Sequence, residues 1–189
     1  MKRTIITLLA TFIVITSFAQ DSHLKFKGVP IDGTLTEFVG KMKTAGFTHI
    51  GTEDGMAMLE GDFAGYKNCK VIVYTVKPLN IVSMIGVAFN ERDNWSDLEG
   101  DYDFFKEMLT EKYGEPALVI EEFKNSPKDN NSKLHELKMD RCIWASAFKT
   151  ESGDIELSIQ QNNFRTWVML RYRDEVNTEK VRKQALEDL

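Results

Sequence analysis

The chain has 189 residues, of which 42% are hydrophobic and 28% charged, with 12 glycines, 4 prolines and 2 cysteines. This composition is typical of a globular protein and excludes collagen-like, disulfide-dense and wholly disordered classes. The formal net charge is −5, and no stretch concentrates lysine and arginine, so the sequence does not predict a nucleic-acid partner.

Residues 1–19 have the three parts of a secretory signal peptide. Lys2 and Arg3 make the start basic, the run from 4 to 18 is apolar and uncharged, and Ser17 and Ala19 are the small residues required at −3 and −1. The apolar run is shorter than the roughly 20 residues that a helix needs to span a bilayer. We therefore expect a mature chain of residues 20–189 that is exported to the periplasm or the medium, with no membrane span after cleavage.

The first half of the mature chain has the pattern of one helix followed by four strands. Thr34 and Glu37 make a capping box, and apolar residues at helical spacing predict a helix that ends at Gly46. Strand-like runs follow at residues 48–53, 56–63, 69–76 and 81–89. Because the connections between these runs are short, the four strands must be antiparallel.

The same order recurs in the second half. Ser96 and Glu99 suggest a capping box for a helix that ends at Gly114, and strand-like runs follow at 117–123, 141–150, 154–161 and 166–173. A last helix is expected at 178–186, with Asn177 as its cap. The polar segment 124–140 is an insertion, which we expect to be a mobile surface loop with one helical turn.

These patterns predict an α+β fold made of two tandem α-β4 units with an antiparallel sheet, helices on one face and an extra C-terminal helix. We expect residues 20–189 to form one domain of two repeats, at about 31–90 and 96–174, plus the C-terminal helix. Residues 56–89 align without a gap with 141–174 at an offset of 85. This alignment assigns the strand residues to two faces of the sheet.

One predicted face is continuously apolar and includes Leu59, Ile72, Tyr74 and Leu157, so the helices should cover it. The opposite face is half apolar, and an exposed apolar patch of this kind usually marks an interaction site. Two alternatives remain open: a partner binds this face, or the C-terminal helix or the 124–140 insertion covers it. The residues assigned to the candidate binding face are Val71, Val73, Val82, Met84, Trp167, Met169 and Arg171.

No catalytic, metal or cofactor site is predicted. The sequence contains no G-x-S-x-G, G-x-G-x-x-G or G-x-x-x-x-G-K-[ST] motif, and its three histidines are not spaced with other metal ligands. The two cysteines, Cys69 and Cys142, are expected to be unpaired because the alignment puts them on opposite faces. A disulfide that closes a large loop is the alternative in an oxidising compartment.

The segment FKGVPIDGTLTEFVGKMKTAGF, followed by LEGDFAGYKNCKV, resembles small secreted proteins of gut anaerobes that are known only as uncharacterised. This likeness covers residues 26–71 and implies no activity. Separately, the order of two α-β4 units is similar to that of the beta-lactamase inhibitor proteins, which use a sheet face to bind an enzyme. That similarity is in the order of elements, with no shared residue motif, and a fold does not fix a function.

The leading hypothesis is an exported, non-catalytic binding module that recognises a protein or a small ligand through its partly apolar sheet face. The alternative is an exported hydrolase in which two carboxylates act as acid and base. That chemistry requires two carboxyl groups about 5–10 Å apart in one pocket.

Overall fold

The structure is a computed structural model that describes residues 23–76 and 79–187. The expected signal peptide, residues 1–19, lies outside these ranges. Within them, no helix is both long enough and apolar enough to cross a membrane.

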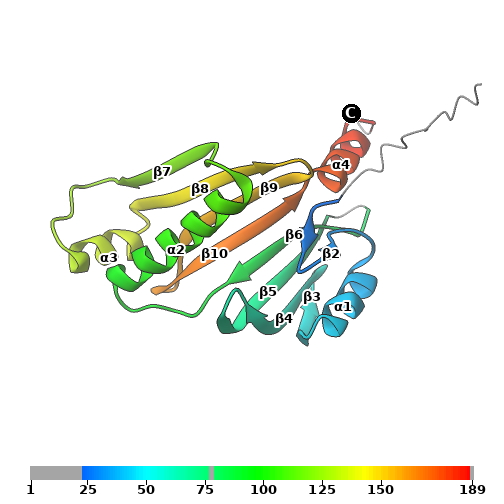
Figure 1. Ribbon diagram of the computed structural model, residues 1–189, viewed down its shortest axis with the longest axis horizontal. Coiled ribbons are helices and arrows are strands. Elements are labelled where there is room, and N and C mark those ends of the chain that lie inside the picture. Colours follow the sequence, from blue (N-terminus) through cyan, green and yellow to red (C-terminus); the bar gives the residue numbers. More distant parts are fainter. Residues whose placement is uncertain (1–22, 77–78, 188–189) are drawn as a thin grey trace, which may run out of the picture.

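The described ranges contain ten strands and four helices (Figure 1). In chain order they are β1 (Lys25–Phe26), β2 (Val29–Pro30), α1 (Leu35–Thr44), β3 (Thr48–Glu53), β4 (Met56–Phe63), β5 (Tyr66–Val76), β6 (Ile81–Ala88), α2 (Trp95–Tyr113), β7 (Leu118–Phe123), α3 (Asn130–Lys138), β8 (Cys142–Thr150), β9 (Gly153–Asn162), β10 (Arg165–Asp174) and α4 (Glu175–Glu187).

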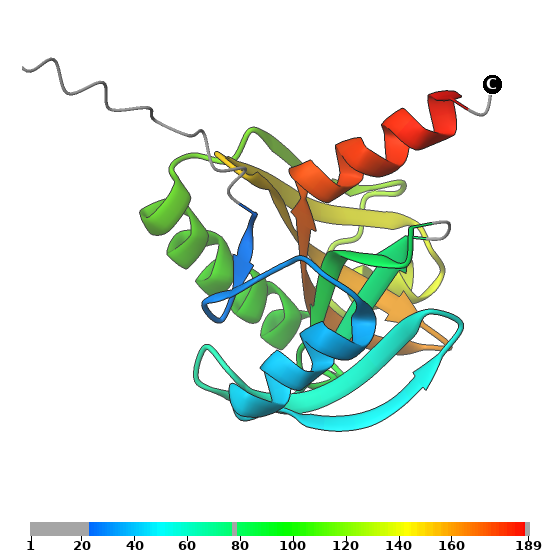
Figure 2. The same ribbon diagram turned by 90° about the vertical axis from the view of Figure 1, so that its right-hand side faces the viewer.

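The two halves of the chain build one twisted sheet of eight strands, in the order β3-β4-β5-β6-β10-β9-β8-β7. Each half is an antiparallel meander, and the halves join where β6 pairs with β10, with Val87 opposite Leu170. Helices α1 and α2 pack on one face of this sheet, and α4 follows the last strand (Figures 1 and 2). The predicted α+β class, antiparallel sheet and C-terminal helix are thus confirmed.

The pairing of β5 with its two neighbours contains two irregularities that the gapless alignment did not include: one extra residue lies in β5, and the other, Ser83, lies in β6. The register of β5 against β4 shifts between Gly61 and Phe63, and its register against β6 shifts between Tyr74 and Thr75. The corresponding hairpins of the second half, β8–β9 and β9–β10, pair without a shift. A β-bulge inserts one unpaired residue, and a slip of one residue moves every following side chain to the other face.

The bulges turn β5 over relative to the prediction. Val71 lies directly opposite Val87, in the row of buried residues that continues to Leu170 and Leu157 on the helix-covered face. Ile72, one residue on, therefore points to the open face. The predicted equivalence of Ile72 with Leu157 is wrong, and so is the assignment of every β5 side chain that depended on it.

The core lies between the helices and the covered face of the sheet. Helix α1 contributes Phe38 and Met42, and α2 contributes Trp95 and Tyr102, all of them fully buried. The short β1–β2 hairpin lies between α1 and α2 (Figure 2). Its Phe26 ring closes that gap, with ring centroids 5.2 Å from Phe63 and 5.4 Å from Tyr172. The remaining core residues include Leu59, Val71, Val73, Ile85, Leu98, Phe105, Phe148, Ile155, Leu157 and Val168.

Two of the three predicted helix caps differ from the observed ones. Helix α1 has the expected Thr34–Glu37 capping box. Helix α2 is capped by Asn94, whose side chain accepts the Asp97 N–H at 2.8 Å. Because the helix already begins at Trp95, Ser96 lies in its first turn and forms no capping box.

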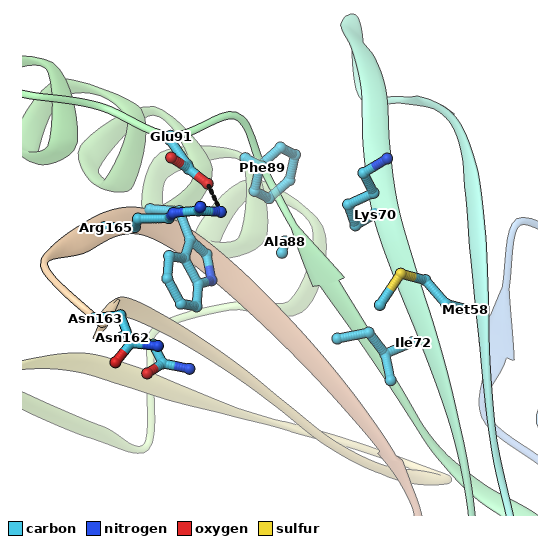
Figure 3. A pocket seen from close by; sticks show the side chains of 10 residues that line it. Met58, Lys70, Ile72, Ala88, Phe89, Glu91, Asn162, Asn163 and Arg165 are labelled. Atoms are coloured by element: carbon cyan, nitrogen blue, oxygen red, sulfur yellow. Dashed lines mark hydrogen bonds and ion pairs between the residues drawn. The ribbon is translucent and has the colours of Figure 1, made fainter. Parts of the chain in front are cut away.

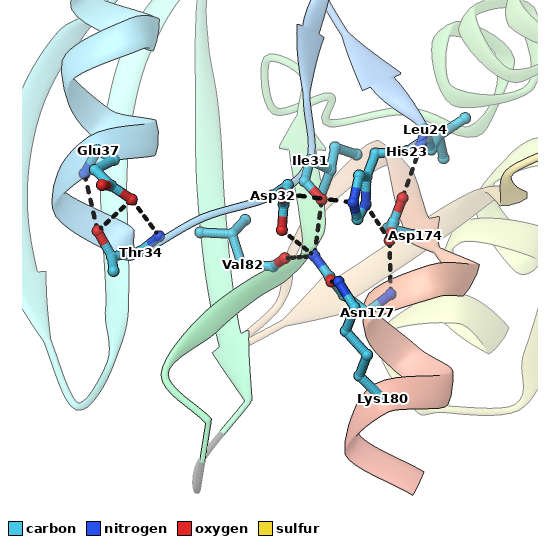
Figure 4. A network of polar contacts seen from close by, with 10 residues as sticks. All are labelled: His23, Leu24, Ile31, Asp32, Thr34, Glu37, Val82, Asp174, Asn177 and Lys180. Atoms are coloured by element: carbon cyan, nitrogen blue, oxygen red, sulfur yellow. Dashed lines mark hydrogen bonds and ion pairs between the residues drawn. The ribbon is translucent and has the colours of Figure 1, made fainter. Parts of the chain in front are cut away.

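Helix α4 begins at Glu175 rather than at 178, and a buried polar network fixes its start (Figure 4). The fully buried Asp174 carboxylate accepts the backbone N–H of Asn177 at 2.8 Å and that of Leu24 at 2.7 Å. His23 Nδ1 lies 3.0 Å from the same carboxylate, and the Asn177 amide donates to the Val82 carbonyl. The network therefore ties the first described residues to the end of β10 and to β6.

The insertion 124–140 forms a nine-residue helix, α3, where a loop with one helical turn was expected. Asp129 caps α3 by accepting the Ser132 N–H at 2.8 Å, and Leu137 is buried against the core. Helix α3 contacts α2, β8 and β9. The segment is therefore packed on the helix-covered side, where Lys133 lies over the Trp95 ring.

Cys69 and Cys142 are both free, as expected, but for a different reason. The rows of the ladder place both on the helix-covered face, in strands β5 and β8. Strands β6, β10 and β9 lie between those two strands. Neighbouring strands are about 4.8 Å apart, so the two thiols are too far apart to bond. Burial raises the pKa of the Cys142 thiol to about 12.

Candidate functional site

The second face of the sheet, called here the open face, is not covered by any described helix. Helix α4 leaves the end of β10 and projects beyond the sheet, while α3 packs beside α2 (Figures 1 and 2). Large apolar side chains remain accessible on the open face, including Ile50 at 54% and Met58 at 42% exposure. The alternative in which the C-terminal helix or the insertion covers this face is therefore wrong for the described residues.

The apolar part of the open face belongs mainly to strands β3 to β6. Cross-strand pairing puts Met56 opposite Tyr74, Met58 opposite Ile72, and Tyr74 opposite Met84. Thioether side chains adapt to irregular partners, so a methionine-rich surface suits recognition. This apolar area consists of Ile50, Met56, Met58, Ile72, Tyr74 and Met84, and Trp167 and Met169 of β10 adjoin it.

Gly86 of β6 explains why Met169 is nearly buried although it belongs to the open face. A Cβ on Gly86 would lie 2.6 Å from Met169 Cε and 3.3 Å from the Tyr74 ring. The missing side chain leaves room for Met169 to lie across β6 towards Tyr74. This contact continues the apolar surface from the first half of the sheet into the second.

Two adjoining hollows mark the open face. One has a volume of about 530 Å³ and lies over β3, β4 and β5, lined chiefly by Ile50, Met56 and Tyr74. The other has a volume of about 410 Å³ and lies between β5 and the β9–β10 turn, whose side chains face those of β4 and β5 across it (Figure 3). Met58 and Ile72 line both hollows, so together they form one groove, called here the open-face groove.

The two ends of the open-face groove differ in polarity. The end over β3 to β5 is mostly apolar, whereas the other hollow has a polar rim made by Asn162, Asn163 and Arg165 at the β9–β10 turn, Glu91 after β6, and Lys70 on β5 across from them (Figure 3). Arg165 lies 3.5 Å from Glu91, and Lys70 pairs with Glu60 on β4. These exposed ion pairs supply both donors and acceptors, with little net charge at the rim.

A polar stripe separates the groove from the far edge of the sheet. Along β9, Gln160 donates to Ser158 at 2.9 Å, Ser158 lies 3.3 Å from Glu156, and Glu156 pairs with Arg171 across the strands. Arg173 and Asp154 form a further cross-strand pair at 3.7 Å. Opposite charges placed directly across two strands stabilise the sheet modestly, so a structural role accounts for these residues.

The structure divides the residues predicted for partner binding. Val71, Val73 and Val82 are fully buried, so the prediction that they line an accessible face is wrong, because the bulges around β5 turn Val71 and Val73 to the helices. Met84, Trp167, Met169 and Arg171 lie on the open face. Of these four, Trp167 lines the open-face groove, and Arg171 belongs to the polar stripe.

Sequence reasoning missed the residues that form most of the groove: Ile50, Met56, Met58, Ile72 and Tyr74. The alternation in β4 carried a usable signal, since Met56, Met58 and Glu60 share one side while Ala57 and Leu59 share the other. No comparable signal existed in β5. Its run VIVY is apolar on both sides, so the pattern alone could not say which side faces the helices.

The open-face groove gives no support to a pair of catalytic carboxylates. Of the residues that line its two hollows, only Glu53 and Glu91 are acidic, one in each hollow. Glu91 is also engaged with Arg165. Neither hollow is therefore lined by the pair of carboxylates that the hydrolase alternative requires.

Comparison of the chain with family models, curated proteins and solved structures gave no match.

Proposed function

We propose that the protein is an exported, non-catalytic binding module, and that the open-face groove recognises an elongated ligand or protein segment with apolar groups. The observation that carries this proposal is the uncovered groove itself, in which methionine, isoleucine and aromatic side chains remain accessible to solvent. Removing apolar surface from water contributes about 25 cal/mol per Å², so filling the groove would be favourable. Export is inferred from residues 1–19.

The arrangement of the groove favours an occupant with one apolar and one polar end. Met56 and Ile50 border the apolar end, whereas Asn162 and Arg165 at the other end offer hydrogen-bond donors. Sites of this type are mostly apolar, with a few polar groups that fix the orientation of the ligand. A side chain or chain segment that lies along β4 and β5 would contact both hollows.

The first test uses the dye 8-anilinonaphthalene-1-sulfonate, which combines an aromatic body with a polar head. The mature chain, residues 20–189, is compared with Met58→Lys, a groove variant, and with Met108→Lys on α2. Met58 and Met108 are 42% and 44% exposed, so the two substitutions are matched in residue type and accessibility. We expect dye fluorescence to fall several-fold in Met58→Lys and to stay at the wild-type level in Met108→Lys, with both variants folded by circular dichroism.

The second test addresses the natural occupant. A photo-crosslinking residue is placed at position 58 or at position 108, and the protein is illuminated in the exported fraction of the producing cells. The proposal requires a discrete crosslinked species at position 58 that Trp167→Ala diminishes, because Trp167 lines the same groove. Equal crosslinking at both positions, or dye binding that is insensitive to Met58→Lys, would contradict it.

A further inference from the structure

The eight-stranded sheet has two outer edges, and they differ in the regularity of their pairing. Strand β3 forms one edge: its register against β4 is interrupted between His49 and Gly51, and its sequence THIGTE is mostly polar. Bulges and polar residues are the features by which edge strands avoid pairing with other chains. Strand β3 is therefore a poor template for a further strand.

Strand β7 forms the other edge, and its pairing is not interrupted; its first three residues are apolar, and Glu121 and Glu122 follow them. Its six residues, LVIEEF, pair with β8 without a shift, and Leu118 and Val119 are 55% and 42% exposed. Ile143 on β8 is also exposed and adds to the apolar surface beside this edge. No described element lies along the outer side of β7 (Figure 1). A regular, apolar and uncovered edge strand invites a partner strand.

The pairing with β8 shows which backbone groups of β7 are available. The Lys124 N–H donates to the Arg141 carbonyl at 2.9 Å, so Lys124 is bonded to its partner strand. In an antiparallel pair the bonded residues alternate with residues whose N–H and C=O point away. Val119, Glu121 and Phe123 therefore direct their backbone groups outwards, and a partner must present groups with the same spacing.

We propose that the partner strand is β7 of a second copy of this chain, paired antiparallel about a two-fold axis. Outward-facing residues must pair with outward-facing residues, and the two strands overlap over most of their length only when the axis passes near the centre of β7, at Ile120 or at Glu121. An axis at Glu121 would place its carboxylate opposite that of the second copy, which is destabilising. An axis at Ile120 instead sets Val119 opposite Glu121 of the second copy, and Leu118 opposite Glu122 of the second copy.

Self-pairing at Ile120 also explains why the association stops at two chains. The interface is isologous, because the same strand is used on both sides, and the remaining edges of the dimer are the two protected β3 strands. The two-fold axis is perpendicular to the sheet, so both open faces lie on the same side. The dimer leaves the open-face groove uncovered and is independent of the proposed binding function.

The test is sedimentation velocity of the mature chain between about 1 and 300 μM, a range suited to the weak association expected of a small interface. We expect the wild type to shift to twice the monomer mass within this range. Val119→Pro removes one outward-facing N–H and leaves the bonds to β8 in place, a position at which edge strands tolerate proline. This variant should stay monomeric, with a far-ultraviolet spectrum like that of the wild type.

The matched control is Ile50→Glu on the other edge strand, where the exposure is 54% against 55% for Leu118. It should dimerise like the wild type, whereas Leu118→Glu, which sets a carboxylate opposite Glu122 of the second copy, should not. A wild type that is monomeric at the highest concentration overturns the proposal, as does a control that dissociates the dimer. If Val119→Pro does not fold, Leu118→Glu decides, because its persistence as a dimer would also refute the pairing.

Discussion

Truncation of two neighbouring side chains in β5 to alanine measures which face each one occupies. Val71 is fully buried beneath the helices, and Val71→Ala removes two methyl groups. At about 0.8 kcal/mol per buried carbon, with a further contribution from the cavity, the loss in unfolding free energy should be about 2–3 kcal/mol. Ile72→Ala removes three carbons from a half-buried side chain in the open-face groove, so we expect a loss of only about 1 kcal/mol.

The order of the two losses is the critical result, because the smaller truncation should cost more. Urea unfolding of the mature chain, followed by circular dichroism, gives both values, and a difference of about 1 kcal/mol corresponds to about 2–4 °C in the thermal midpoint. Without the bulges the two side chains would exchange faces, and Ile72→Ala would be the more damaging change. An equal or larger loss for Ile72→Ala would therefore refute the assignment of faces.

Three further predictions concern backbone strain, packing and pH. Phe164, at the tip of the β9–β10 hairpin, is 65% exposed and has φ +64, a left-handed backbone conformation that strains a residue with a side chain. Phe164→Gly relieves this strain and should raise the unfolding free energy by up to about 1 kcal/mol. A decrease of similar size, measured by thermal unfolding, would contradict this prediction. A Cβ on Gly61 would lie 2.5 Å from the Phe47 ring, so Gly61→Ala should cost about 1–3 kcal/mol in urea unfolding, and an unchanged midpoint would contradict this. Burial alone would raise the pKa of Asp32, but hydrogen bonds to its carboxylate, chiefly the one from the Asn177 side chain, lower the pKa below its ordinary value. The ionised carboxylate therefore stabilises the fold above about pH 4, and this stabilisation is lost as the pH falls. Asp32→Asn should accordingly lose less stability than the wild type between pH 6 and pH 3, and equal acid sensitivity of the two proteins would exclude this role.

The elements could be predicted from the sequence because their signals are local. Helix α1 shows its capping box and its apolar stripe within ten residues, and the Asp54-Gly55 turn marks the β3–β4 hairpin. Short connections then required antiparallel strands, which gave the fold class. The pairing of β6 with β10 is compatible with this pattern, but it is a contact between distant segments that no local signal contains.

The faces of β5 could not be predicted, since the distinction depended on bulges and on a run that is apolar on both sides. A two-residue period assigns faces only where polar and apolar residues alternate, and the run from Val71 to Tyr74 offers no such alternation. The full length of the helix in the insertion and the burial of Asn177, which was expected only as a helix cap, were not predicted for a related reason. Both depend on contacts with distant residues, such as the Asn177 amide with the Val82 carbonyl.

The bulges on either side of β5, which made the gapless alignment wrong for this strand, also create the candidate site. With β5 in the predicted orientation, Ile72 and Tyr74 would pack under the helices, and the open face beside Met58 would carry the smaller Val71 and Val73. The bulges instead put the longer side chains opposite Met56 and Met58, where they line both hollows of the open-face groove. The second half, which lacks bulges in its equivalent hairpins, keeps strict alternation and presents the polar stripe at the corresponding place. Two units with the same order of elements therefore expose different surfaces on the open face, and the apolar hollows of that face lie mainly over the bulged unit.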